Sequence, residues 1–229
     1  MNDFQFPGWT NKAVMLGLVG VLFMGGYAAT VGFFATHPDV INVGHQPRQP
    51  VPFSHKLHAG ELKLDCRYCH TTVDKAAMAA IPPTATCGNC HGGTLVKEGA
   101  TLASVHLTSE KLEPVRVSLE TGNPVPWKRV HELPDFVYFN HSAHVNRGVS
   151  CVECHGRIDK MEVVYQAKQL SMKWCLDCHR NPDAHIRPVE FVTQLDWKPA
   201  DGQDPAEIGK ALRAEKNINP STNCSTCHR

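Results

Sequence analysis

The sequence has no surplus of either charge, and it has no cysteine to spare for a disulfide. Its 229 residues include 23 Lys and Arg against 22 Asp and Glu, which gives a formal net charge of +1. It also contains no run of basic residues, the usual electrostatic signature of a nucleic-acid-binding surface. We therefore expect no nucleic-acid partner.

All ten cysteines lie in a Cys-x-x-Cys-His motif that occurs five times. Numbered as sites 1 to 5 in chain order, the motifs are Cys66/Cys69/His70, Cys87/Cys90/His91, Cys151/Cys154/His155, Cys175/Cys178/His179 and Cys224/Cys227/His228. A Cys-x-x-Cys pair alone occurs in zinc sites and redox dithiols, whereas the trailing histidine indicates covalent attachment of c-type haem. No cysteine remains as a nucleophile, and nothing else in the sequence resembles a hydrolytic site.

The spacing of the motif follows from the chemistry of haem c. Two thioethers bond the two vinyl groups at one edge of the porphyrin, and the adjacent histidine then binds the iron from one face. A structural zinc site needs no histidine after each cysteine pair. The sequence thus predicts five covalently bound haem c groups, with His70, His91, His155, His179 and His228 as the proximal iron ligands.

One stretch of the chain has no formal charge over 24 residues, from residue 13 to residue 36. It is long enough for a helix to cross a bilayer core of about 30 Å, and longer than the roughly 7–15 apolar residues of a signal peptide. We expect residues 1–36 to be retained as an anchor that spans the bacterial inner membrane once. Haem is attached on the outer side of that membrane, so the motifs are predicted to lie in the periplasm.

The rest of the chain divides around the motifs. Residues 37–52 contain four prolines and are predicted to form an extended linker. A first two-haem unit at 53–91, a second at 139–179 and the fifth motif at 224–228 then form one pentahaem domain, residues 53–229. About 190 residues cannot bury both a side-chain core and five macrocycles. We therefore expect short α-helices and loops packed around five haems, little sheet, and folding that depends on the cofactor.

Each two-haem unit opens with a pair of histidines, His55 and His58 in the first and His141 and His144 in the second. The two pairs are related by the same offset of 86 residues (141−55 and 144−58). Residues i and i+3 share a helix face, so each pair can bind two irons from one short helix. The alternative is that these are surface histidines, but their recurrence ahead of a haem motif favours distal ligands.

The fifth distal ligand is less clearly marked. His131 is our first choice, because it lies just before the second unit. Met161 and Met172 precede the fourth motif, and a methionine ligand would raise the potential of its haem; the alternative for each is packing against a porphyrin. Four histidines rank below these: His106 and His185 in loops and, in the linker, His37 and His45, which we do not expect to bind iron.

The two histidine pairs carry a resemblance to a known family. Phe53-Ser54-His55-x-x-His58 and Phe139-Asn140-His141-x-x-His144, each followed by Cys-x-x-Cys-His, resemble the class III multihaem cytochromes of the c3 and c7 group. The resemblance implies that His55 binds the iron of site 1 and His141 that of site 3. It also implies that His58 and His144 reach neighbouring haems, which the sequence does not identify.

A longer resemblance covers nearly the whole chain. With the N-terminal anchor, residues 66–91 and 129–180 are similar to the pentahaem cytochrome subunit of bacterial alternative complex III. This implies menaquinol as electron source and a soluble periplasmic cytochrome c or copper protein as acceptor. It also implies three kinds of partner in the membrane complex: an iron–sulfur protein, quinol-binding multi-helix membrane subunits and a monohaem cytochrome c.

Two other functions compete with an electron-transfer subunit. A single-span multihaem quinol dehydrogenase would oxidise quinol at its own haem, but that type has four haems and lacks the paired histidines. A multihaem reductase needs an iron with an open position, whereas candidate ligands here outnumber the irons. One membrane helix is also too little to form a quinol pocket, so we expect the chain to be no enzyme by itself.

Overall fold

A computed structural model describes residues 6–37, 40, 42–93 and 105–228 of the chain. The chain divides into two compact parts, a membrane segment (Met1–Asn42) and a motif-bearing domain (Val43–Arg229), and each is described by itself. Residues 1–5 of the expected anchor and residues 38, 39 and 41 of the expected linker lie outside the described residues, as do 94–104 and 229.

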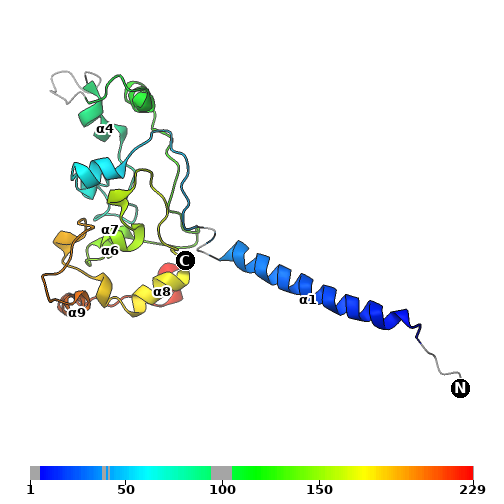
Figure 1. Ribbon diagram of the computed structural model, residues 1–229. Coiled ribbons are helices and arrows are strands. Elements are labelled where there is room, and N and C mark those ends of the chain that lie inside the picture. Colours follow the sequence, from blue (N-terminus) through cyan, green and yellow to red (C-terminus); the bar gives the residue numbers. More distant parts are fainter. Residues whose placement is uncertain (1–5, 38–39, 41, 94–104, 229) are drawn as a thin grey trace. The chain divides into compact units, whose positions relative to one another are not determined.

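The membrane segment is one continuous helix, α1 (Trp9–Thr36), of 28 residues (Figure 1). Proline is absent from it, and it ends just before the His37-Pro38 step, where a proline disfavours helical geometry in the residue ahead of it. The hydroxyls of Thr30 and Thr36 each donate to a carbonyl one turn back, at 2.8 Å. These two hydroxyls therefore need no hydrogen bond from water. By its length and apolar composition, α1 fits a single-pass membrane anchor.

The motif-bearing domain is built from short helices joined by loops. In chain order they are η1 (Lys56–Glu61, a π-helix), α3 (Cys66–Cys69), α4 (Thr84–His91), η3 (Glu110–Leu112), α5 (Glu113–Thr121), α6 (His141–Val145), α7 (Cys151–His155), η4 (Ile158–Lys160), α8 (Met172–Arg180), η5 (Asp183–His185), η6 (Val189–Phe191), α9 (Pro205–Glu215) and α10 (Cys224–Cys227). In the described residues the extended pairings are two isolated bridges, Val137 with His228 and Val149 with Ile186. The prediction of a helical, loop-rich domain with little sheet is confirmed.

Each Cys-x-x-Cys pair lies on a short helix: α3, α4, α7, α8 or α10. Local capping places several of these turns. The Asp65 carboxylate accepts from the Arg67 amide at 2.8 Å ahead of α3, and the Ser171 hydroxyl accepts from the Trp174 amide at 3.3 Å ahead of α8. Because residues i and i+3 share a helix face, one turn presents both cysteines on the same side.

Side chains alone form only small cores in this domain. One cluster contains Val51, Val115 and Val125, and another contains Val73, Val145 and Val192. These valines come from loops and from two helices of at most nine residues, α5 and α6, rather than from long packed helices. A core this small fits a fold whose interior is completed by bound macrocycles.

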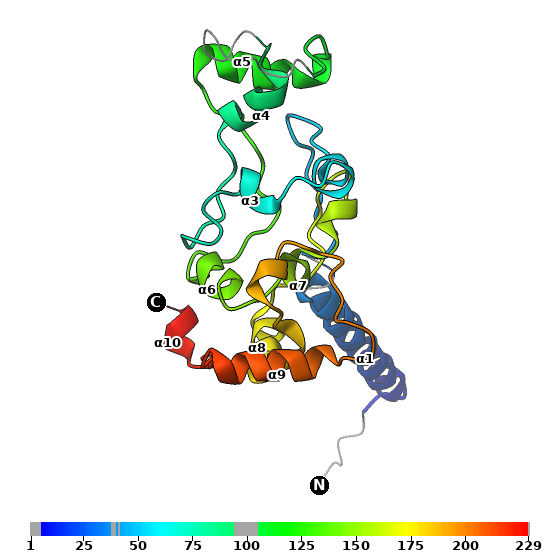
Figure 2. The ribbon, with the colours of Figure 1, turned by 90° about the vertical axis from the view of Figure 1, so that its left-hand side faces the viewer.

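The motif helices follow one another through the domain in an order that differs from the chain order. In Figure 2, α4 and α5 lie at one end, α3 comes next, α6 and α7 follow, and α8, α9 and α10 lie at the other end. The loop after site 1 packs on α6, where the amides of His141 and Ser142 donate to the carbonyls of Ala77 and Ala76 at 3.1 and 3.2 Å. The two units are therefore in direct contact.

Candidate haem-binding sites

The expected attachment cysteines differ in how far the protein covers them. Eight of the ten are partly buried, whereas Cys90 of site 2 and Cys224 of site 5 are exposed. Helix α4, which carries Cys90, lies at one end of the domain (Figure 2). Cys87, one turn earlier on α4, packs against the valine cluster that contains Val115. Site 2 is therefore covered at one cysteine and open to solvent at the other.

Four of the five proximal histidines are oriented by a backbone carbonyl. The Nδ1 atoms of His70, His91, His179 and His228 face the carbonyl oxygens of Ala80, Val105, Ser221 and Phe136 at 2.7, 2.8, 2.6 and 3.4 Å. A metal-binding histidine usually donates its second ring nitrogen in this way, which fixes the tautomer and leaves Nε2 to bind the metal. Ala80 delivers its carbonyl from a left-handed backbone, with φ of 52°.

The fifth proximal histidine, His155, has a different partner. Its Nδ1 lies 3.3 Å from Nε2 of His131, with the two rings edge to face and their centroids 4.4 Å apart. Burial, followed by the nearby His131, lowers the pKa of His155 to about 3, so its imidazole is neutral. The proximal ring of site 3 is thus held by another imidazole and not by a backbone carbonyl.

This position of His131 differs from the role expected from the sequence. A metal–imidazole bond is about 2.0–2.1 Å long, so two axial histidines on one iron hold their ring centroids roughly 6–6.5 Å apart. At 4.4 Å from His155, the ring of His131 leaves no room for an iron between them. The structure places His131 behind the proximal ligand of site 3, and the identity of the fifth distal ligand stays a prediction.

Three pairs of histidine rings do have the spacing of axial ligands. The ring centroids of His58 and His91 are 6.3 Å apart, those of His141 and His155 are 6.4 Å apart, and those of His144 and His179 are 6.1 Å apart. These distances match the roughly 6–6.5 Å required across one iron. The paired histidines therefore face the proximal histidines of sites 2, 3 and 4.

A phenylalanine holds each histidine pair in place. Phe53 stacks on His58 at 4.3 Å and meets His55 edge-on at 4.9 Å. Phe139 stacks on His144 at 4.6 Å and meets His141 edge-on at 4.8 Å. Such contacts restrict the ring rotamers, so the phenylalanine of the repeated motif positions two imidazoles at once.

The Nδ1 atoms of three of the four paired histidines also have a backbone carbonyl as hydrogen-bond partner. The Nδ1 atoms of His58 and His144 face the carbonyls of Ser54 and Asn140, each at 2.8 Å, and Nδ1 of His141 faces the carbonyl of Ala77 at 2.8 Å. All three are therefore oriented as the proximal histidines are, with Nε2 left to bind a metal.

His55 is the exception among the paired histidines. Its Nδ1 is buried without a hydrogen-bond partner, which costs about 1–3 kcal/mol for such a group. Burial, followed by the nearby His70, lowers the pKa of His55 to about 4, so this ring is neutral. A buried, neutral and unpaired imidazole beside His70 fits a ligand of the iron at site 1.

The remaining candidates for the distal ligand of site 5 are spread over the domain. Met161 is buried, with 6% of its surface exposed, and lies in the core near Gly156. Met172 opens α8 with 67% of its surface exposed, one turn before Cys175. Among the described ring contacts, His228 has no histidine partner at axial spacing, so its distal ligand stays unassigned.

His185 has the orientation of a metal ligand that sequence reasoning ranked low. Its Nδ1 lies 2.7 Å from the Glu153 carboxylate, and Arg187 holds the other carboxylate oxygen at 3.3 Å. The hydrogen bond to Glu153 raises the pKa of His185. Carboxylate–histidine pairs of this kind orient metal ligands in other proteins. The feature of the sequence that could have pointed to His185 is the acidic residue Glu153 inside the motif of site 3, which can pair with a histidine.

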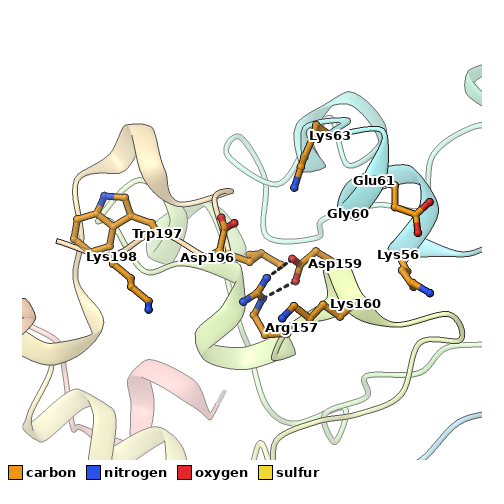
Figure 3. A pocket seen from close by; sticks show the side chains of 11 residues that line it. Lys56, Gly60, Glu61, Lys63, Arg157, Asp159, Lys160, Asp196, Trp197 and Lys198 are labelled. Atoms are coloured by element: carbon orange, nitrogen blue, oxygen red, sulfur yellow. Dashed lines mark hydrogen bonds and ion pairs between the residues drawn. The ribbon is translucent and has the colours of Figure 1, made fainter. Parts of the chain in front are cut away.

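A cleft of about 590 Å³ opens between η1, η4 and residues 195–198 (Figure 3). Its charged lining comprises five cations, Lys56, Lys63, Arg157, Lys160 and Lys198, and three acids, Glu61, Asp159 and Asp196. Arg157 and Asp159 bind each other through two hydrogen bonds of 2.8 and 2.6 Å. Lys56 directly follows His55 and Arg157 lies two residues after His155, so this cleft lies close to sites 1 and 3.

These features define a class: a multihaem c-type cytochrome, with helical turns that carry Cys-x-x-Cys-His motifs and imidazoles held at axial spacing. The family model described as "Cytochrome c7 and related cytochrome c" matches residues 51–109 and 137–229, and the chain belongs to this family. Membership implies covalently bound haem c. The chain is also 25% identical, over the full length of both sequences, to the "Menaquinone reductase, multiheme cytochrome c subunit" of Nitratidesulfovibrio vulgaris (strain Hildenborough).

Proposed function

We propose that this chain is the electron-transfer subunit of a membrane quinol oxidoreductase similar to alternative complex III. It relays electrons from menaquinol oxidation, through five c-type haems, to a periplasmic cytochrome c or copper protein. Bound haem c supplies the one-electron redox chemistry. The observation that carries the proposal is the set of three histidine ring pairs at 6.1–6.4 Å, each pairing a motif histidine with a histidine outside the motifs.

The role of these residues is to fill both axial positions of an iron. An iron with two imidazole ligands has no position open for a substrate, which suits electron transfer and not the chemistry of a reductase. The chain also sets the electronic environment of each site, through the acceptor that each Nδ1 faces and through burial. The ring pairs thus favour an electron-transfer subunit over an enzyme with its own substrate.

The membrane partners follow from two observations. The relative is named as a subunit of a menaquinone reductase, which supports a place for this chain in a quinone-linked complex. Helix α1 provides one span, with no buried side chain. In this proposal the quinol-binding pocket belongs to multi-helix membrane subunits, with an iron–sulfur protein and a monohaem cytochrome c as further subunits and the motif-bearing domain on the periplasmic side.

A second candidate differs only in the direction of electron flow. The name of the relative describes reduction of menaquinone, which is the reverse of menaquinol oxidation. A chain of haems conducts in either direction, and the potentials of its partners decide which one occurs. The same sites would then carry electrons from a periplasmic donor into the quinone pool.

Haem absorbance in the purified complex tests both candidates. We expect menaquinol to reduce the haems of the intact complex within its turnover time, and the isolated subunit in detergent to stay oxidised. Haem reduction by a periplasmic donor, followed by menaquinone reduction, would support the reverse direction. Rapid reduction of the isolated subunit by menaquinol would instead support a single-span quinol dehydrogenase that feeds a periplasmic reductase.

A further inference from the structure

The contacts between the motifs follow the chain order in three places and depart from it in one. Sites 1 and 2 do touch: the Asn89 amide, inside the second motif, donates to the hydroxyl of Tyr68, inside the first, at 2.9 Å. Helix η1 also presents His58 to His91 of site 2, and the family resemblance assigns His55, the residue before η1, to site 1. Sites 1 and 2 are therefore neighbours.

Site 1 also touches site 3, although 85 residues separate Cys66 from Cys151 (151−66). A short segment ties the two motifs together: Thr193 donates to the carboxylate of Asp65 at 2.7 Å, and the Val192 carbonyl accepts from the amide of Cys151 at 3.3 Å. Residues 192 and 193 therefore bridge the motifs of sites 1 and 3, and these two sites are neighbours.

The remaining links lie within the second half of the chain. Helix α6 presents His141 to site 3 and His144 to site 4, so these two sites are neighbours. His179 of site 4 faces the carbonyl of Ser221, three residues before Cys224 of site 5, at 2.6 Å. Site 5 thus follows site 4, and the described contacts provide it with no second neighbouring site.

We infer that the chain holds its five sites in a single unbranched row in the order 2–1–3–4–5. Figure 2 agrees, since the motif helices run α4, α3, α7 and then α8 with α10. The ends of the row are sites 2 and 5, and the two exposed attachment cysteines, Cys90 and Cys224, belong to these same sites. The partners that deliver and remove electrons therefore meet the chain at the two ends. The bridge through residues 192 and 193 joins the two units between sites 1 and 3.

This order rests on the haems of the proposed function, but not on the identity of the donor or acceptor. The order also predicts that equivalent histidines of the two units bind haems with different numbers of neighbouring sites. His58 serves site 2, an end of the row with one neighbour. His144 serves site 4, an interior position with two neighbours. If the two units were arranged identically, the haems bound by His58 and His144 would have the same number of neighbours.

The variants His58→Met and His144→Met test the order. Methionine keeps the iron six-coordinate and raises the potential of its own haem, which changes the electrostatic effect of that haem on its neighbours. In a redox titration of the holoprotein followed by electron paramagnetic resonance, we expect His58→Met to shift one other haem and His144→Met to shift two. Two or more shifted neighbours for His58→Met, or a single one for His144→Met, would overturn the order.

A measurement on the unaltered protein covers the case in which a variant does not fold. In a haem-resolved structure of the holoprotein, the irons nearest to site 1 should be those of sites 2 and 3. An arrangement in which sites 1 and 3 are not neighbours contradicts the inference. If the row is found but menaquinol does not reduce the haems of the complex, the proposed function fails while the order stands.

Discussion

The two histidine-pair segments use the same side chains on different backbones. The stacked distances between phenylalanine and the second histidine are 4.3 Å in the first unit and 4.6 Å in the second, and the edge-on distances are 4.9 and 4.8 Å. The backbone is a π-helix (Lys56–Glu61) in the first unit and an α-helix (His141–Val145) in the second. The repeat therefore preserves ring positions and not helix type.

Each of these segments is supported by the other unit. Gly60 in η1 lies so close to η4 that an added Cβ would be 2.2 Å from the carbonyl oxygen of Asp159. The equivalent residue of the second unit is Asn146 (60+86), whose amide donates to the Asp74 carbonyl at 2.9 Å. The comparison shows that the two units hold each other's histidine pairs, one through close packing and one through a hydrogen bond.

The largest effect is expected from removing a histidine of either pair. His58→Ala and His144→Ala should each convert one low-spin iron to high spin, at site 2 and site 4, because each removes an axial imidazole. His55→Ala should do the same at site 1. Loss of the ligand and of its phenylalanine stack should also lower the free energy of unfolding by about 2–5 kcal/mol. Electron paramagnetic resonance and haem-monitored unfolding measure the two effects, and five low-spin irons in every variant would mean that the pairs are surface histidines.

A smaller effect is expected where the units touch. Gly60→Ala should lower the free energy of unfolding by about 1–3 kcal/mol, because the new methyl group meets a carbonyl that cannot move freely. Asn146→Ala, at the equivalent position, removes one hydrogen bond and should cost about 0.5–1.5 kcal/mol. Chemical unfolding of the holoprotein compares them, and a larger effect for Asn146→Ala would reverse our account of how the units support each other.

The sequence predicted those features of the structure that are determined by residues close together along the chain. The spacing of Cys-x-x-Cys-His anticipated the short helical turns, and the use of both histidines of a pair as iron ligands stays a prediction. It did not predict that η1 would be a π-helix or that Gly60 of η1 would pack against Asp159, a residue 99 positions away (159−60). Local propensity contains no information about such contacts.

The partners of the second histidines also depend on long-range packing. His58 reaches His91 and His144 reaches His179 only because the intervening loops bring each second motif back to the pair. His131 was chosen for its position just before the second unit, but closeness along the chain does not show which proximal histidine a ring will meet. The order of the sites could not be predicted from the sequence either, because sites 1 and 3 are joined by residues 192 and 193, which are far from site 1 along the chain.

The capping residues allow a finer comparison of the two pairs. Ser54 accepts from the Leu57 amide at 3.0 Å and donates to the Glu162 carboxylate at 3.0 Å, whereas Asn140 caps α6 by accepting from the Ala143 amide at 3.3 Å. Each alanine substitution should cost about 0.5–2 kcal/mol, with Ser54→Ala the more costly because it also loses a charge-assisted hydrogen bond. Unfolding midpoints compare the two, and equal midpoints would count against a role for Glu162.

The smallest effect concerns the proximal histidines of sites 1 and 3. His70 faces the carbonyl of Ala80, whereas His155 faces the imidazole of His131. His131→Ala should leave all five irons low-spin and shift the potential and resonance signal of site 3 alone, because the orientation of His155 changes while its bond to iron remains. A new high-spin iron at site 5 would show instead that His131 is a distal ligand.

A haem-resolved structure of the holoprotein tests the central claim most directly, since it identifies the ligands of each iron. We predict one iron between Nε2 of His58 and His91, a second between His141 and His155, and a third between His144 and His179. Any of these six imidazoles directed away from iron, with another residue in its place, would contradict the assignment of the repeated histidine pair as ligands.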